Sequence, residues 1–234
     1  MNTLIEASLH SEKVSNMDSK LFLVLCNHRS GSSAVAGVLH HLGIHMGEQL
    51  IGPSSSNLKG HFENINFVIM NDKILESLNS FWFAPPSRTS VLSNQFPKDQ
   101  IRSFLSNQVK PVWGVKDPRT ALTFDIWKPF FEEISDITFI FVWRPIEQSV
   151  SSLALREGFG ERTADFILKI YEDNLKRIRK ELEQKEKDII DINFSDLLGN
   201  PEPFVKEINF RLNKKEDQNI ENVRGFLDGK LKHF

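Results

Sequence analysis

Hydrophobic residues in this chain form short continuous runs, and these runs alternate with segments of helical periodicity. One run extends from Leu21 to Cys26, and "ITFIFVW" (residues 137–143) is another. Continuous apolar runs of this length are typical of strands that are buried on both faces of a parallel sheet. The segments "PVWGVK" and "DIIDINF" (residues 111–116 and 188–194) indicate two further strands.

The segments between these strands place apolar residues three and four positions apart, which predicts helices. The predicted helices cover residues 34–42, 67–78, 120–134, a segment that begins after Pro145, residues 164–187 and residues 201–212. Pro129 is expected to bend or interrupt the third helix. Residues 84–97, rich in Pro, Ser and Asn, are expected to form a loop.

Strands that alternate with helices predict an α/β fold: a three-layer, P-loop-like domain with a central, mostly parallel sheet flanked by helices. The chain has 234 residues, which is enough for one domain with a substantial core. We expect residues 20–234 to form this single domain and residues 1–19 to be a flexible leader.

Charge and cysteine content narrow the classes of function. The net charge is −2, without the basic excess that contact with a nucleic-acid backbone requires, so a nucleic-acid partner is not expected and anion binding must be local. Cys26 is the single cysteine, which rules out an intrachain disulfide and a zinc cluster of thiolates. We find neither a secretory signal nor a transmembrane run of about 20 apolar residues, so a cytoplasmic protein is expected.

The first candidate site is "NHRSGSS", which follows the first strand and opens a helix. Unpaired backbone N–H groups at the start of a helix favour a bound phosphate. Gly31 lets the backbone approach a ligand, Ser32 and Ser33 supply hydroxyl groups, and Arg29 supplies a guanidinium. The alternative is a tight turn in which a serine caps the helix. The lysine of an ATP-binding loop is absent, so γ-phosphate transfer is poorly served.

The second candidate site is "RPIEQSVSSLALREGF". Arg144 follows the strongest strand, and Ser152 lies on the helix after it, so both could reach one ligand. Ligands of open α/β sheets bind at the carboxyl ends of strands. Two anion sites at neighbouring strand ends suit a nucleotide with phosphates at both ends. The alternative is that Arg144 pairs with Glu147 or Glu157 and Ser152 is an ordinary helix residue.

Four motifs in order make the chain resemble the sulfotransferases that use 3′-phosphoadenosine 5′-phosphosulfate (PAPS), especially bacterial members with an "HRSGTS"-type loop. These motifs are "NHRSGSSAVAGVLHHLG", "NLKGHFENINFVIMND", "WGVKDPRTALTFDIW" and "RPIEQSVSSLALREGF". The resemblance extends from the first strand to the helix after Pro201. It departs from the family where Ser32-Ser33 replaces a threonine-containing pair and where Pro145 follows Arg144 directly.

The resemblance implies a role for each motif. Residues 29–33 (Arg29, Ser30, Gly31, Ser32 and Ser33) look like the loop for the 5′-phosphosulfate, and Arg144 with Ser152 looks like the site for the 3′-phosphate. Lys116 and Arg29 would be the cations at the sulfonate, and no metal would be required. For Lys116, the alternative is a structural ion pair with Asp117.

The resemblance also points to a general base near the acceptor. Glu63 is the first candidate, because partial burial beside a cofactor would raise the pKa of its carboxyl toward neutrality. The alternative is that Glu63 only stabilises the start of a helix. Asp117 and His61 are reserve candidates, and both, together with Arg119, are candidates for acceptor binding.

The expected activity is therefore sulfuryl transfer from PAPS to a hydroxyl (or amine) of a small-molecule, sugar or lipid acceptor, with adenosine 3′,5′-bisphosphate as the product. Two alternatives are a small-molecule kinase of the P-loop architecture and a catalytically inactive nucleotide-binding scaffold. The C-terminal basic residues Arg224, Lys230 and Lys232 are expected to form a frayed tail, although relatives can close such a segment over the 3′-phosphate. The oligomeric state is left open.

Overall fold

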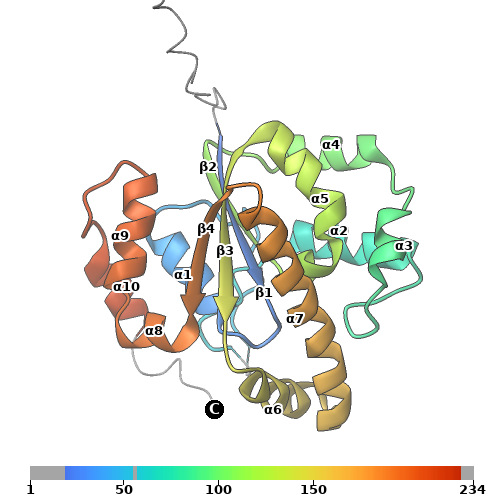
Figure 1. Cartoon of the computed structure of the whole chain (residues 1–234). Helices are drawn as coiled ribbons and strands as arrows, with labels where there is room; N and C mark the ends of the chain where they lie inside the picture. Colours follow the sequence, from blue (N-terminus) through green and yellow to red (C-terminus); the bar gives the residue numbers. More distant parts are fainter. Residues whose placement is uncertain (1–18, 55–56, 228–234) are drawn as a thin grey trace, which may run out of the picture.

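The computed structural model describes residues 19–54 and 57–227. Its centre is a parallel sheet of four strands in the order β2-β1-β3-β4 (Figure 1). The strands are β1 (Lys20–Cys26), β2 (Val112–Lys116), β3 (Asp136–Trp143) and β4 (Asp188–Asn193). The predicted α/β fold with a parallel sheet is confirmed.

Helices cover both faces of this sheet. The helices are α1 (Ser32–His41), α2 (Ile65–Ser77), α3 (Arg88–Leu92), α4 (Lys98–Ser106), α5 (Thr120–Ile134), α6 (Ile146–Glu157), α7 (Glu161–Glu183), α8 (Phe194–Gly199), α9 (Glu202–Arg211) and α10 (Ile220–Phe226). Figure 1 shows α1 and α8 to α10 on one side of the sheet and α2, α5 and α7 on the other.

The side chains of β1 divide the core into two layers, because successive residues of a strand point to opposite faces. Leu21, Leu23 and Leu25 pack with residues of α2, α4, α5 and α7. Phe22, Val24 and Cys26 pack with residues of α1, α8, α9 and α10. The continuous apolar run of β1 is explained by these two layers, since every one of its positions from Leu21 on is buried.

Three local predictions need correction. Helix α5 runs without a break across Pro129, so the predicted interruption did not occur. Residues 84–97 are not entirely loop, because α3 lies within them and its first turn is capped by the side chain of Ser87, which accepts a hydrogen bond from Ser90 N. Part of the C-terminal segment that we expected to be frayed forms α10, which contains Arg224. Lys230 and Lys232 lie outside the described residues, and so do residues 1–18 of the predicted leader.

The sheet brings the two candidate anion sites to the same edge. Strands β1 and β3 are parallel neighbours, and Cys26 is in register with Val142. The loop after Cys26 and the turn that contains Arg144 therefore leave the sheet side by side at its carboxyl end.

Candidate functional site

The loop between β1 and α1 contains two residues with positive φ angles, and α1 begins after it without a capping side chain. Arg29 and Gly31 both have positive φ angles, 60° and 84°, and Gly31 is the N-cap residue of α1. No side chain caps the first turn, so the alternative of a serine cap is not what the structure has. A Cβ atom on Gly31 would lie 2.1 Å from Cδ2 of Phe194, so this position requires glycine for space as well as for its backbone conformation.

Buried hydrogen bonds hold this loop in place. The Asn27 side-chain amide donates to Leu168 O on α7 (3.0 Å), and its Oδ1 accepts from the backbone N–H of His28 (2.9 Å). Ser30 Oγ donates to Asn27 O (2.9 Å). Ser30 therefore stabilises the loop through its side chain and does not line the cleft described next.

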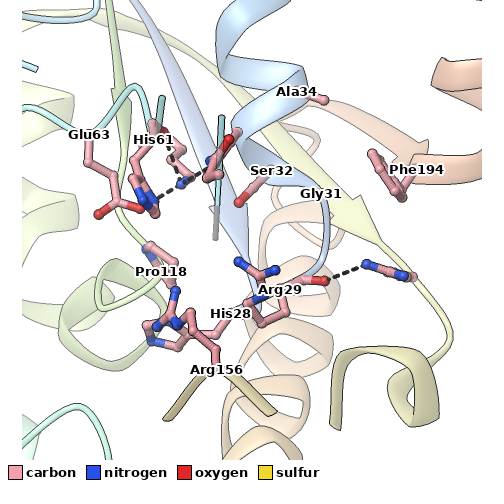
Figure 2. A pocket seen from close by; sticks show the side chains of 14 residues that line it. His28, Arg29, Gly31, Ser32, Ala34, His61, Glu63, Pro118, Arg156 and Phe194 are labelled. Atoms are coloured by element: carbon pink, nitrogen blue, oxygen red, sulfur yellow. Dashed lines mark hydrogen bonds and ion pairs between the residues drawn. The ribbon is translucent and has the colours of Figure 1, made fainter. Parts of the chain in front are cut away.

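A cleft lies over the carboxyl ends of β1, β2 and β3, next to the start of α1 (Figure 2). Its lining contains most of the residues that the sequence singled out: Arg29, Gly31, Ser32, Ser33, His61, Glu63, Lys116 and Arg144. In Figure 2, Glu63 and His61 lie on one side of the cleft and Phe194 lies on the other, with Arg29 between them. The expected shared cleft for Arg29 and Arg144 is thus present, whereas Ser30, Ser152, Asp117 and Arg119 are outside its lining.

The shortest ion pair in this lining joins Lys116, at the end of β2, to Glu63, just before α2. Lys116 Nζ lies 2.6 Å from Glu63 Oε1, and only 3% and 10% of the two side chains are exposed. The same ammonium donates to Ser33 Oγ and to His61 O, each at 3.2 Å. Lys116 therefore connects Ser33, at the start of α1, to Glu63, the first candidate for the base. Asp117, the alternative partner that the sequence suggested for Lys116, pairs with Arg119 instead.

The ionisation of Glu63 differs from the expectation. Burial raises the pKa of the Glu63 carboxyl, but the charge of Lys116 and its hydrogen bond outweigh burial, and the resulting pKa is below its ordinary value. The predicted increase toward neutrality is wrong for this state of the protein. The sequence could not supply this result, because Lys116 is 53 residues away along the chain.

The two arginines at the opposite side of the cleft are held by different partners. Arg29 Nε donates to Ser152 Oγ (2.9 Å), while Arg144 Nη1 donates to Arg29 O (3.0 Å) and Arg144 Nε to Gln148 Oε1 (3.0 Å). The guanidinium of Arg144 also lies over the ring of Phe194, at 5.3 Å from its centroid. Ser152 thus contacts Arg29 and not Arg144, although the sequence placed Ser152 with Arg144.

Asp117 and Arg119 form a buried pair behind the cleft. Asp117 Oδ1 accepts from the backbone N–H and from Nη1 of Arg119, each at 3.0 Å, and Asp117 Oδ2 accepts from the Asn71 amide at 2.8 Å. Arg119 Nε lies 2.8 Å from Asp72 Oδ1. Burial raises the pKa of Asp117, and Arg119 opposes this increase. These contacts give Asp117 and Arg119 a structural position under the turn after β2, and their predicted roles toward an acceptor stay predictions.

His61, the other reserve base, does line the cleft. Its Nε2 lies 3.2 Å from Ser54 Oγ. Burial lowers the pKa of the His61 imidazole, and the Glu63 carboxylate acts against this effect. A neutral imidazole next to Glu63 is thus available in the cleft, and the assignment of the base between these two residues stays a prediction.

Sequence reasoning missed several lining residues, namely His28, Asn57, Pro118, Arg156 and Phe194. Arg156 was detectable in principle, because it follows Ser152 by four positions and therefore lies on the same face of α6. Phe194 was not detectable, since only the pairing of β3 with β4 brings it to Gly31 and Arg144.

Three further features of the described residues concern metal binding, the cysteine and the membrane. No group of three or more His, Cys, Asp or Glu side chains in residues 19–54 and 57–227 is arranged to hold a metal ion. Burial raises the pKa of the Cys26 thiol to about 11, which agrees with a cysteine that only fills space in the core. No helix in the described part of the chain has the length and apolar character needed to cross a membrane.

Comparison with known proteins gives matches by structure and not by sequence. No protein-family model and no curated protein matches the sequence. The structure is similar to sulfotransferase STF1 from Mycobacterium tuberculosis, with a TM-score of 0.55, 13% identity, and coverage of 88% of this chain and 71% of that one. It is also similar to sulfotransferase STF9 from Mycobacterium avium, with a TM-score of 0.54, 12% identity, and coverage of 92% and 69%. At these identities the likeness establishes a shared fold, which is the P-loop-like α/β fold that the sequence predicted.

Proposed function

We propose that this protein is a sulfotransferase that uses PAPS as the donor and a hydroxyl compound as the acceptor. The observation that carries the proposal is the cleft itself, where a buried Lys116–Glu63 pair lies beside an uncapped helix start and three arginines. The fold shared with two sulfotransferases agrees with this proposal. The missing lysine in the loop before α1 speaks against the kinase alternative.

The donor would lie along the cleft with its two anionic ends apart. The N–H groups at the start of α1 and the hydroxyls of Ser32 and Ser33 would hold the 5′-phosphosulfate, close to Lys116. Arg144, with the helix that carries Ser152, would hold the 3′-phosphate, and Arg29 between them would contact either end.

The residues of this chain would contribute positioning and charge to the transfer. The donor supplies an activated sulfonate when bound. Lys116 and Arg29 would stabilise charge that develops on the oxygens between sulfur and phosphorus, and the Glu63 carboxylate would accept the proton of the acceptor hydroxyl. Glu63 is ionised because Lys116 holds its pKa down, so it is ready to accept a proton without prior deprotonation.

The direct test is binding of adenosine 3′,5′-bisphosphate, measured by isothermal titration calorimetry with ATP as the comparison ligand. The proposal expects binding of the bisphosphate that is at least about tenfold tighter than that of ATP. Preferential binding of ATP would refute it. A screen of acceptors with isotopically labelled PAPS, read by mass spectrometry for an added sulfonate, would then separate an enzyme from an inactive nucleotide-binding scaffold.

A further inference from the structure

His28 is a cleft residue to which neither the sequence motifs nor the proposed mechanism gives a role. It precedes Arg29 in the loop after β1, lines the cleft, and is only 7% exposed. Its ring lies against two aromatic rings, with centroid distances of 4.9 Å to Trp82 and 5.0 Å to Tyr171. These contacts fix the orientation of the imidazole.

The hydrogen bonds of Tyr171 determine which nitrogen of His28 carries the proton. Tyr171 has a single hydroxyl proton, and its O–H donates to the backbone oxygen of Trp82 at 3.0 Å. His28 Nε2 lies 3.3 Å from the same hydroxyl oxygen. Both contacts are hydrogen bonds at once only if Nε2 carries a proton and donates it to the Tyr171 oxygen. Nδ1 of a neutral His28 then has a lone pair.

This lone pair on Nδ1 of His28 is not used by a hydrogen bond within the described part of the chain. Nδ1 is also absent from the set of fully enclosed side-chain atoms that have no hydrogen-bond partner in that part of the chain. Nδ1 is therefore not enclosed, and His28 is one of the residues that line the cleft. An accessible acceptor atom of fixed direction is what a donated O–H group requires.

The charges around His28 keep it in this neutral form. Burial lowers the pKa of His28 well below its ordinary value, and the cations of Arg119, Arg156, Lys116 and Arg29 lower it further. An imidazole among these cations is a poor proton acceptor but a good hydrogen-bond acceptor. The same cations disfavour an ammonium group in the cleft, since the Glu63 carboxylate is already paired with Lys116.

We infer that His28 Nδ1 accepts a hydrogen bond from the sulfonate acceptor and orients its nucleophilic atom, and that this acceptor is an uncharged hydroxyl compound and not a cationic amine. This inference rests on the proposed function. The acceptor oxygen forms a bond to sulfur while the bond from sulfur to the bridging phosphate oxygen breaks. The proton of this oxygen passes to the Glu63 carboxylate, while His28 accepts a hydrogen bond from a second O–H group of the acceptor and stays neutral throughout.

Two substitutions separate this role from simple packing. His28→Gln places an amide nitrogen where Nε2 is, so it can keep the contact with Tyr171 but has no acceptor at the position of Nδ1. His28→Asn places its side-chain oxygen near the position of Nδ1 but loses the contact with Tyr171. Both variants are compared with the wild type in two assays: sulfate released from labelled PAPS with water as the acceptor, and affinity for adenosine 3′,5′-bisphosphate.

We expect His28→Gln to lower the rate at saturating PAPS by at least about tenfold, the equivalent of one lost hydrogen bond, and His28→Asn to stay within about threefold of the wild type. Bisphosphate affinity should be unchanged in both. A rate for His28→Gln equal to the wild type, or lower rates for His28→Asn than for His28→Gln, would overturn the inference and indicate packing on Tyr171 alone.

The protonation state of the His28 ring can also be measured without turnover. This measurement distinguishes a failure of the inference about His28 from a failure of the proposed function. In ¹⁵N-histidine NMR spectra of the full chain, His28 should show a protonated Nε2 and a bare Nδ1, unchanged between about pH 8 and about pH 6.5. A proton on Nδ1, or titration in that range, would overturn the inference even if bisphosphate binds. Absence of bisphosphate binding with the expected NMR result would instead refute the proposed donor.

Discussion

The Lys116–Glu63 pair gives the prediction that the structure constrains most. The substitution Lys116→Met removes the cation and keeps a side chain of similar length. The two charged atoms are 2.6 Å apart, and both side chains are almost completely buried. At an effective dielectric constant of about 20, two charges at this distance attract by about 6 kcal/mol before desolvation is counted. Removing one partner of a buried pair costs about 3–5 kcal/mol, and we expect a loss of unfolding free energy in this range at pH 7.

The loss should depend on pH in a defined direction. In the wild type the pKa of Glu63 is lowered, so its contribution is present above the unfolded-state pKa of about 4.3 and is lost as the pH falls through the folded-state value. Without Lys116, burial dominates and raises the pKa of Glu63, so the penalty in the variant grows as the pH rises above about 4.3. Both effects make the difference between wild type and variant smallest at acidic pH, below the folded-state pKa of Glu63, and complete at neutral pH.

The assay is urea unfolding of the wild type, Lys116→Met, Glu63→Gln and the double variant, at neutral and acidic pH. The double variant should recover much of the loss, because it contains no unpaired buried charge. Lys176→Met is the control, since Lys176 forms a pair with Glu172 on the exposed face of α7, and its unfolding midpoint should match the wild type. A loss below about 1 kcal/mol for Lys116→Met, or an equal loss at both pH values, would refute the reasoning.

Three further predictions concern the neighbouring residues. Gly31→Ala should lower the unfolding free energy by about 1–3 kcal/mol in urea titrations, because the new Cβ would meet Phe194 at 2.1 Å and the φ angle of 84° is unfavourable for alanine; a stability equal to the wild type would contradict this. Arg144→Ala should weaken binding of adenosine 3′,5′-bisphosphate by about tenfold or more in calorimetry but change the rate at saturating donor much less, and a selective loss of rate would place Arg144 at the sulfonate instead. Asp117→Asn should cost about 3 kcal/mol of unfolding free energy, because Arg119 loses a buried carboxylate at 3.0 Å; an unchanged denaturation midpoint would argue against a structural role for this pair.

The sequence predicted the fold because the apolar composition of the strands shows directly that they are buried. The apolar run of β1 has no polar interruption after Lys20, and that of β3 is interrupted only by Thr138, which is the pattern of strands covered on both faces. Short amphipathic or polar helices were harder to predict. Helix α4 (Lys98–Ser106) buries only Ile101 and Leu105, which is too weak a period to recognise among charged residues.

The site was predicted in part. The sequence identified Arg29, Gly31, Lys116 and Glu63, and all four line one cleft. It did not predict that Ser152 would contact Arg29, because this contact depends on how α6 packs against the loop after β1. Phe194 lines the cleft because it begins α8 directly after β4, and β4 comes to lie beside β3 only in the folded sheet.

By itself the sequence determined where the chain forms buried strands and where an anion could be held, because burial and turn chemistry are local properties of composition and spacing. The tertiary structure alone decided which charges pair. It set Lys116 against Glu63, 53 residues away along the chain, and so reversed the expected direction of the pKa of Glu63. The physical reason is distance: electrostatic interactions between buried groups depend on separations of a few ångströms, and these are fixed only when residues remote in sequence are packed together.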